Sequence, residues 1–199
     1  MANTAICAEI DGEIDLSCIR GIAKKYFQEV VIINYNDVDR TASVLGTIDT
    51  TCDYTIQMVL KEGKKGVKFK IPETSGSIFG TATKSSADTT GLPQYSHLVQ
   101  ILAMGIDSEI KCLLDKLGRG KFIIATQLTS GTVEIYGWEN GLSTGDFTID
   151  IAAGGGASVV PIQSKDTEQE SMLPLIYKPQ TGGDANADFN AQFEQPDTP

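Results

Sequence analysis

The residues that could take part in catalysis are few and lie far apart in the sequence. His97 is the single histidine, and the four cysteines are Cys7, Cys18, Cys52 and Cys112. A catalytic triad needs a histidine near a Ser or Cys nucleophile, and no G-x-S-x-G nucleophile elbow occurs in the chain. The cysteines form no C-x-x-C pair, the spacing typical of zinc sites. We therefore predict that the protein is not an enzyme and has no catalytic residue, cofactor or metal site.

Two short motifs resemble ligand-binding loops but depart from them at positions that the ligand requires. Residues 184–195 begin like an EF-hand calcium loop, with the pattern D-x-N-x-D. The sixth position should be glycine and is Phe189, and the twelfth should be a bidentate Glu and is Gln195. Residues 118–121 (GRGK) resemble part of a phosphate-binding loop, but Phe122 stands where that motif has Ser or Thr. We predict neither a calcium nor a phosphate site.

The start of the chain and the cysteines bear on where the protein is made. Met1 is not followed by the charged segment and apolar stretch of a signal peptide, and no apolar run reaches the ~20 residues of a membrane helix. We expect intracellular synthesis, with thiols that are reduced, buried and inert. Cys112, next to Leu113 on a predicted helix, is interpreted as a core residue. Trp138 is interpreted as packing at the end of a strand.

A helix over residues about 107–117 is the clearest predicted element. The Asp107 carboxylate can accept hydrogen bonds from the N–H groups of the first turn. Apolar residues recur from Ile110 to Leu117 at i, i+3, i+4 and i+7, which gives the helix one apolar stripe. Gly118 stands where a left-handed C-cap is expected. One face of the helix is therefore predicted to pack on the core.

A β-hairpin is predicted directly after this helix. Residues 122–125 (FIIA) are continuously apolar, which indicates a strand buried on both faces. Ser130 and Gly131 supply the turn, and Val133 and Ile135 then share one face of the second strand. The helix and hairpin form the unit to which the other strands are added.

Further strands follow from runs of β-branched and alternating residues. Residues 30–35 form one strand, and residues 48–60 and 67–71 are predicted to pair as a hairpin. Residues 94–104 are interpreted as a strand, with a helix as the alternative. Weaker strands are expected at 5–10, 147–151, 159–163 and 173–177, of which 159–163 is demoted to a sheet edge by Pro161.

Two polar segments leave alternatives open. Residues 73–92, rich in Thr, Ser and Gly, are predicted to form a long loop that is mobile or contacts a partner, and a poor edge strand at 77–84 is the alternative. The five lysines from Lys61 to Lys70 form the basic cluster of the chain. They fit a solvated hairpin or a surface that pairs with an acidic partner subunit.

Overall charge excludes some classes of function. The chain has 199 residues, enough for one core, with 26 acidic and 16 basic side chains and a net charge of −10. General nucleic-acid binding and docking on anionic membranes both need clustered basic residues. After Lys178 the composition becomes polar and acidic, so we predict a domain over 1–177 and an arm over 178–199. Deleting this arm is expected to leave the fold intact and to weaken assembly.

The order of these elements resembles the tail tube (major tail) proteins of tailed bacteriophages. The segments that carry the resemblance are IKCLLDKLGRGKFIIATQ and EIYGWENGLSTG, and residues 14–35 are similar to the N-terminal opening of such proteins. The resemblance spans roughly residues 14–177. The triple glycine at 154–156 and the acidic arm after Lys178 do not match the family pattern.

The resemblance implies a fold and a function. The fold would be a mainly β, antiparallel β-sandwich or barrel-like domain with one flanking α-helix (about 107–117), the long loop 73–92 and extended termini. The protein would be a structural virion subunit of the tail, synthesised in the host cytoplasm. Its copies would form hexameric rings that stack into a tube, with the loop and termini as contacts between subunits, and DNA would pass without specific binding and without a membrane partner. An acidic wall would repel phosphates, which fits the net charge.

Two other interpretations fit the same features. The chain could be a head-decoration, neck or tail-completion protein with a similar β-fold. It could also be a β-sandwich module that binds a carbohydrate or host surface through Trp138, Tyr136 and Asn140. Self-association into tubes separates the first reading from these alternatives.

Overall fold

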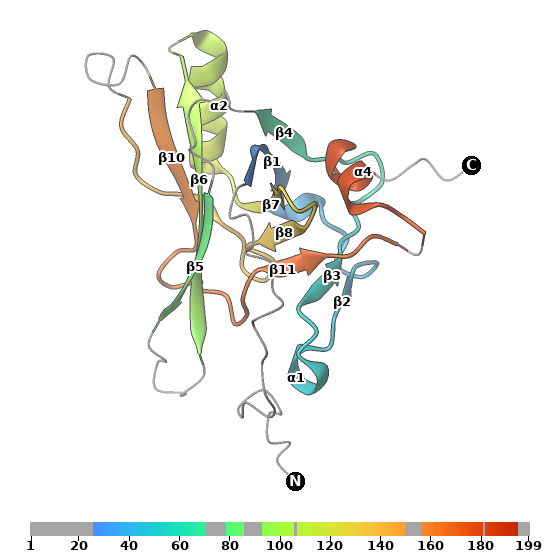
Figure 1. Cartoon of the computed structure of the whole chain (residues 1–199). Helices are drawn as coiled ribbons and strands as arrows, with labels where there is room; N and C mark the ends of the chain where they lie inside the picture. Colours follow the sequence, from blue (N-terminus) through green and yellow to red (C-terminus); the bar gives the residue numbers. More distant parts are fainter. Residues whose placement is uncertain are drawn as a thin grey trace.

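Two β-sheets and a long helix make up the computed structural model (Figure 1), which describes residues 26–70, 79–85, 93–105, 107–149, 157–180 and 182–194. The strands are β1 (Tyr26–Asn34), β2 (Val44–Leu45), β3 (Thr55–Gln57), β4 (Val67–Lys70), β5 (Phe79–Ser85), β6 (Gln94–Met104), β7 (Phe122–Leu128), β8 (Val133–Tyr136), β9 (Ser143–Thr144), β10 (Ala157–Gln163) and β11 (Leu175–Tyr177). The helices are the short 3-10 helix η2 (Tyr35–Asp37), α1 (Ile48–Thr51), α2 (Ser108–Arg119) and α4 (Ala185–Asn190). The expected mainly β fold with a flanking helix is confirmed.

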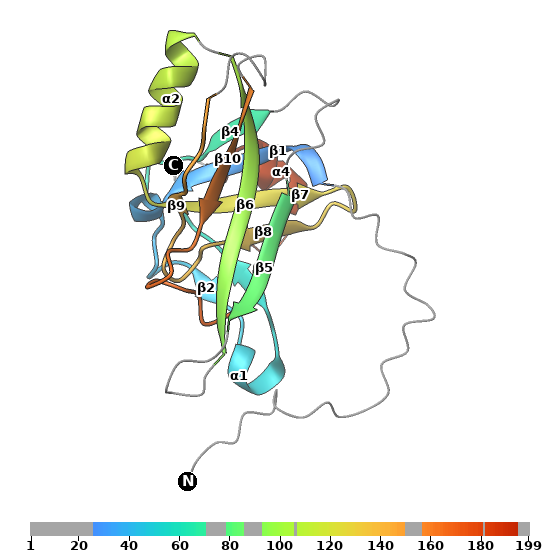
Figure 2. The same ribbon diagram turned by 90° about the vertical axis from the view of Figure 1, so that its left-hand side faces the viewer.

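The larger sheet has seven strands in the order β2-β3-β11-β8-β7-β1-β4, and the smaller has four in the order β5-β6-β10-β9. All pairings are antiparallel except that of β11 with β3, which is parallel. The long strand β6 runs across the strands of the larger sheet in Figure 2, with α2 beside it. This crosswise arrangement is one of the two usual ways in which two sheets pack face to face.

Strand β7 lies inside the larger sheet, between β8 and β1, and is buried on both faces, as its apolar run predicts. Ile124 points into a cluster between the two sheets, which α2 joins through Leu114 and Leu117. Ile123 points the other way, into a second cluster that includes Phe189 of α4. The larger sheet therefore has a core on each side, and the alternation of side chains along one strand builds both.

Helix α2 begins as predicted and ends two residues later than expected. The Asp107 side chain accepts a hydrogen bond from the backbone N of Ile110 at 2.9 Å. Gly118 is inside the helix, and Gly120 with φ −93° is the C-cap, so a left-handed cap at Gly118 is wrong. The Thr144 hydroxyl donates to the Leu117 carbonyl at 2.7 Å, which satisfies one of the last carbonyl groups without a glycine turn.

Strand β6 confirms the strand at 94–104 over the helical alternative. Its inward side chains, among them Val99 and Ile101, are fully buried. Strand β5 pairs along it from Phe79 to Ser85. Residues 79–85 of the expected long loop 73–92 are therefore an edge strand, close to the alternative at 77–84. The rest of that loop and the strand expected at 5–10 lie outside the described residues.

The predicted hairpin of 48–60 with 67–71 is wrong. Residues 48–51 form α1, β3 pairs with β2 and β11, and β4 pairs with β1 at the other end of the sheet. The alternating residues Ile56, Met58 and Leu60 are nevertheless all buried. Alternation specifies which face of a strand is buried, but it does not specify which neighbour completes the hydrogen-bond ladder.

Two smaller expectations also fail. Of the strand expected at 147–151, residues 147–149 form no strand and residues 150–151 lie outside the described residues. Pro161 does not lie at a sheet edge, because β10 has β6 on one side and the two-residue strand β9 on the other. The Pro161 carbonyl accepts a hydrogen bond from the Gly145 N–H at 2.8 Å. A proline fits here because β9 is too short to need a donor at that position.

The segment after Lys178 belongs to the body of the domain and is not a separate polar arm where the structure describes it. Phe189 and Phe193 are 0% and 1% exposed and pack in the second core cluster. Figure 1 shows α4 beside the larger sheet. Two aromatic residues in a polar segment supply enough apolar area to hold it on the sheet, so average composition is a poor guide here.

Candidate functional site

His97 is a structural residue of the core. It is 1% exposed, its Nε2 lies 3.0 Å from the Met172 carbonyl oxygen, and its Nδ1 accepts the Gly137 N–H at 3.2 Å. Burial lowers the pKa of His97 to about 4. Both ring nitrogens are occupied by backbone groups, so the ring has no free lone pair to activate a nucleophile.

The turn at residues 137–141, which contacts His97, contains two glycines in the left-handed region. Gly137 and Gly141 have φ of +72° and +73°, values that favour glycine, and the Gly141 N–H donates to the Gly137 carbonyl at 3.1 Å. This turn places Trp138 against the second core, where it is 8% exposed. The expected position of Trp138 at a strand end is confirmed.

Arg40 covers the aromatic residues that a carbohydrate site would use. Its guanidinium carbon lies 3.9 Å from the Trp138 ring centroid and 4.7 Å from that of Tyr35. Tyr136 is 3% exposed and its hydroxyl donates to Glu134 at 2.8 Å. A sugar platform needs an open aromatic face, so this arrangement stabilises the turn and leaves no stacking surface.

Glu170 holds the same turn from the other side. It is fully buried, and its two carboxylate oxygens accept the backbone N–H groups of Glu139 at 2.7 Å and Asn140 at 2.8 Å. The Asn140 side chain donates to the Gln169 carbonyl at 2.6 Å, so this residue is also committed to the protein. Burial raises the pKa of the Glu170 carboxyl, although its two N–H donors oppose that shift.

Replacing Glu170 with alanine is expected to lower the free energy of unfolding by about 2 kcal/mol. Two backbone N–H groups would lose their acceptor inside the protein, a loss offset in part because a buried carboxylate is removed. Urea unfolding followed by tryptophan fluorescence measures the change. Glu168→Ala, which removes an exposed carboxylate paired with Lys121, is the matched control and should change stability little.

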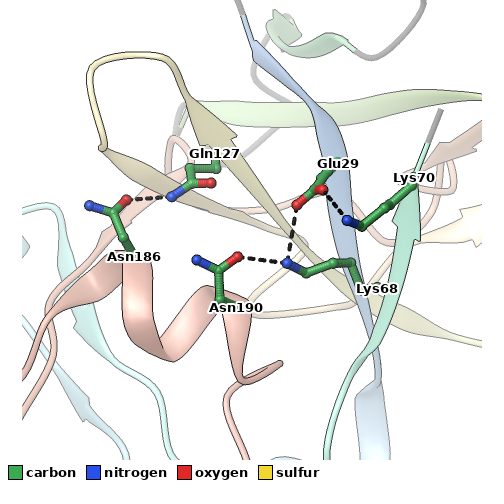
Figure 3. A network of polar contacts seen from close by, with 6 residues as sticks. All are labelled: Glu29, Lys68, Lys70, Gln127, Asn186 and Asn190. Atoms are coloured by element: carbon green, nitrogen blue, oxygen red, sulfur yellow. Dashed lines mark hydrogen bonds and ion pairs between the residues drawn. The ribbon is translucent and has the colours of Figure 1, made fainter. Parts of the chain in front are cut away.

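The lysines of the basic cluster form contacts within the chain, and Figure 3 shows those of Lys68 and Lys70. Lys68 and Lys70 lie 3.1 Å and 2.8 Å from the two carboxylate oxygens of Glu29, and the hydrogen bond from Lys70, together with Lys68, lowers the pKa of Glu29. Lys68 also donates to Asn190 of α4 at 2.7 Å. The remaining members contact the Asn36 carbonyl (Lys61), Asp37 (Lys64) and Glu194 (Lys65). The cluster thus ties β4 to β1 and to the C-terminal segment.

An open polar cleft of about 590 Å³ lies beside this network, between the β7–β8 turn and α4. Its amide groups already bond each other, because Gln127 donates to Asn186. In the segment that resembles a calcium loop, Asp184 caps α4 and Asp188 accepts the Tyr177 hydroxyl. Among the described residues, no group of three or more His, Cys, Asp or Glu could hold a metal.

The side chains of the GRGK segment form ion pairs, and Cys7 and Cys18 lie outside the described residues. Arg119 pairs with Asp115 of its own helix at 2.9 Å, and Lys121 pairs with Glu168. Cys112 is free and exposed, so its expected core position is wrong, because it lies just outside the apolar stripe of α2. Cys52 is disulfide-bonded, so the expectation of reduced thiols is wrong for this residue.

None of the family models, curated proteins or solved structures compared with this chain matches it.

Sequence patterns do not single out Arg40 and Glu170, the two charged residues most involved in the turn at 137–141. Both lie in polar segments with no period. Arg40 contacts Trp138, which is distant in sequence, and the Glu170 carboxylate accepts backbone groups. In the described chain, no helix is both long and apolar enough to cross a membrane. The side chains of His97, Trp138 and Asn140 are engaged in contacts within the chain.

Proposed function

We propose that the protein is a structural subunit that assembles with copies of itself, as the tail tube subunit of a tailed bacteriophage. The observation that carries this proposal is the exposure of apolar side chains on strands at the sheet edges. Val44 and Leu45 on β2, Val67 on β4 and Phe79 on β5 are 59%, 39%, 59% and 39% exposed. Unprotected edges of this kind invite pairing with another chain, and ring closure removes them.

The strand directions of the larger sheet suit repeated head-to-tail pairing. Following the pairings from β4 to β2, strand β2 runs opposite to β4. If β2 of one copy meets β4 of the next with both copies in the same orientation, the new pair is antiparallel. Such a heterologous contact generates a ring when the rotation closes.

Charge also favours a head-to-tail contact over a symmetric one. Lys64, Lys65 and Lys70 beside β4 keep 52%, 57% and 71% of their side-chain surface exposed. Two β4 edges in contact would bring these lysines together, and like charges across an interface are unfavourable. A contact with another part of a chain of net charge −10 avoids this repulsion.

Lysine substitutions at the two edges test the proposal. Val44→Lys and Val67→Lys are expected to leave the monomer folded, because both side chains are exposed, and to abolish assembly. Ile176→Lys is the matched control, because Ile176 is 45% exposed but lies on β11 inside the sheet. Mass photometry and electron microscopy of the purified proteins give the readout.

The same images separate the alternatives. Stacked rings support a tube subunit, whereas single rings or monomers favour a head-decoration, neck or tail-completion protein. If the wild-type chain stays monomeric at all concentrations, the proposed function is wrong.

A further inference from the structure

The polar cleft between the β7–β8 turn and α4 offers hydrogen-bonding groups from three segments of the chain. Its volume of about 590 Å³ lies within the usual range of ligand pockets, ~300–1,000 Å³. Glu29 of β1, Gln127 of β7 and Ser130 of the turn line it, together with Asn186 and Asn190 of α4. In the described part of the chain, no aliphatic or aromatic residue lines this cleft.

The Asn190 side chain is held so that its amide nitrogen is free to donate. Its amide oxygen accepts a hydrogen bond from Lys68 at 2.7 Å, and a lysine can only donate, so the nitrogen must be the other end of the amide. Figure 3 shows this nitrogen on the side away from Lys68. Lys68 is in turn held by Glu29 at 3.1 Å, which fixes the arrangement.

Gln127 and Asn186 supply a second free donor and a free acceptor. Gln127 is 6% exposed, and its amide nitrogen donates to the amide oxygen of Asn186. This bond leaves the Gln127 oxygen as an acceptor and the Asn186 nitrogen as a donor, neither of which has a partner among the described residues. If both amides were turned over, one donor and one acceptor would still remain. A molecule in the cleft is needed to complete the hydrogen bonds of the buried Gln127 side chain.

The charge beside the cleft is already paired. Lys68 and Lys70 lie 3.1 Å and 2.8 Å from the Glu29 carboxylate, and neither lysine lines the cleft. The lining therefore favours neither a phosphate, which needs basic groups, nor a nucleobase, which needs an aromatic platform. It fits a neutral molecule rich in hydroxyl groups, because each hydroxyl can both donate and accept.

We propose that the polar cleft binds a neutral sugar, as a single hexose unit of a glycan. Sugar hydroxyls would accept from the amide nitrogens of Asn186 and Asn190, donate to the amide oxygen of Gln127, and take the place of water. A few neutral hydrogen bonds without aromatic stacking give weak binding, with a Kd of about 1 mM or more. This site goes beyond the proposed function and does not depend on assembly.

Nuclear magnetic resonance of the ¹⁵N-labelled full chain tests the proposal. Val44→Lys is used if the wild type assembles, because this variant is expected to stay monomeric; if the wild type is monomeric, the proposed function fails and the wild type itself is titrated. The probes are the methyl glycosides of glucose, galactose and mannose, and N-acetylglucosamine. At least one of them is expected to shift the side-chain amide signals of Gln127, Asn186 and Asn190 in a saturable manner.

Aspartate substitutions remove a single donor from the cleft. Asn190→Asp keeps the oxygen that faces Lys68 and should weaken the binding of that sugar about 2–10-fold, the usual effect of losing one hydrogen bond. Asn186→Asp keeps the acceptor for Gln127 and is the second variant, and circular dichroism checks that both are folded. Asn36→Asp, at an exposed amide of η2 outside the cleft, is the matched control and should leave binding unchanged.

Two further probes distinguish other ligand classes, inorganic phosphate for an anion and N-methylacetamide for a peptide group. A shift of the three amide signals with either probe and with none of the sugars overturns the proposal. So does the absence of any saturable shift, or equal weakening by Asn190→Asp and Asn36→Asp.

Discussion

Replacing Phe189 with alanine is expected to lower the free energy of unfolding by about 3–5 kcal/mol, the usual cost of truncating a buried phenylalanine. Phe189 is 0% exposed and makes edge-to-face contact with Phe193 at a centroid distance of 6.3 Å. Phe193 in turn packs on Tyr177 of β11 at 4.9 Å. The substitution would thus leave a cavity at the centre of the second core, and the measurement is chemical unfolding monitored by circular dichroism.

Phe79→Ala is the matched control for this prediction. Phe79 is 39% exposed on an edge strand, so the same change of residue type should cost much less there. If the two variants lose equal stability, α4 does not contribute to the core as described. The same geometry reverses the expectation that residues 178–199 can be deleted without loss of fold, because the deletion removes both Phe189 and Phe193.

Sequence periodicity predicts those elements whose pattern arises from burial of a single segment. The stripe from Ile110 to Leu117 and the run from Phe122 to Ala125 correctly predict α2 and β7. The pattern of residues 94–104 correctly predicts the strand β6. In each case the signal is local, because the buried positions recur with the period of the element itself.

The pairing of strands is less predictable, because the partner of a strand is decided by the whole sheet. Residues 55–57 and 67–70 are close in sequence and have suitable patterns, yet they take places near opposite ends of the larger sheet. The backbone of Cys52, with φ +53°, ends α1 just before β3 and redirects the chain. A non-glycine residue in this conformation gives no signal in the sequence.

The C-terminal segment shows the limit of composition as a guide. Its polar residues are used in specific contacts: the Gly66 N–H donates to the Gln192 carbonyl at 2.9 Å, and Lys68 donates to Asn190 at 2.7 Å. These contacts join the segment to β4, one of the edges proposed to pair between copies. We therefore expect the stability of the monomer to be coupled to the ability of β4 to pair with another copy.

Acid is expected to destabilise the protein through His97, by about 3 kcal/mol between pH 6.5 and pH 4. Burial lowers the pKa of His97 from 6.5 to about 4 in the folded protein, so in this range the unfolded chain binds a proton that the folded chain excludes. The contribution is fully present above pH 6.5 and is lost as the pH falls toward 4. At about 1.4 kcal/mol for each pH unit between the two values, the loss is about 3 kcal/mol.

The measurement is the free energy of unfolding at several pH values in wild type and in His97→Gln. The buried carboxyl of Glu170 works in the opposite direction, because its raised pKa makes the folded chain bind a proton more readily than the unfolded chain as the pH falls toward 4.5. Both proteins keep Glu170, so the difference between their pH profiles isolates the histidine. His97→Gln should be less stable than wild type at pH 7, because the Gly137 N–H loses the ring nitrogen as its acceptor. Its stability should fall less steeply below pH 6.5, and parallel profiles for the two proteins would show that His97 is not the neutral, backbone-bonded residue described above.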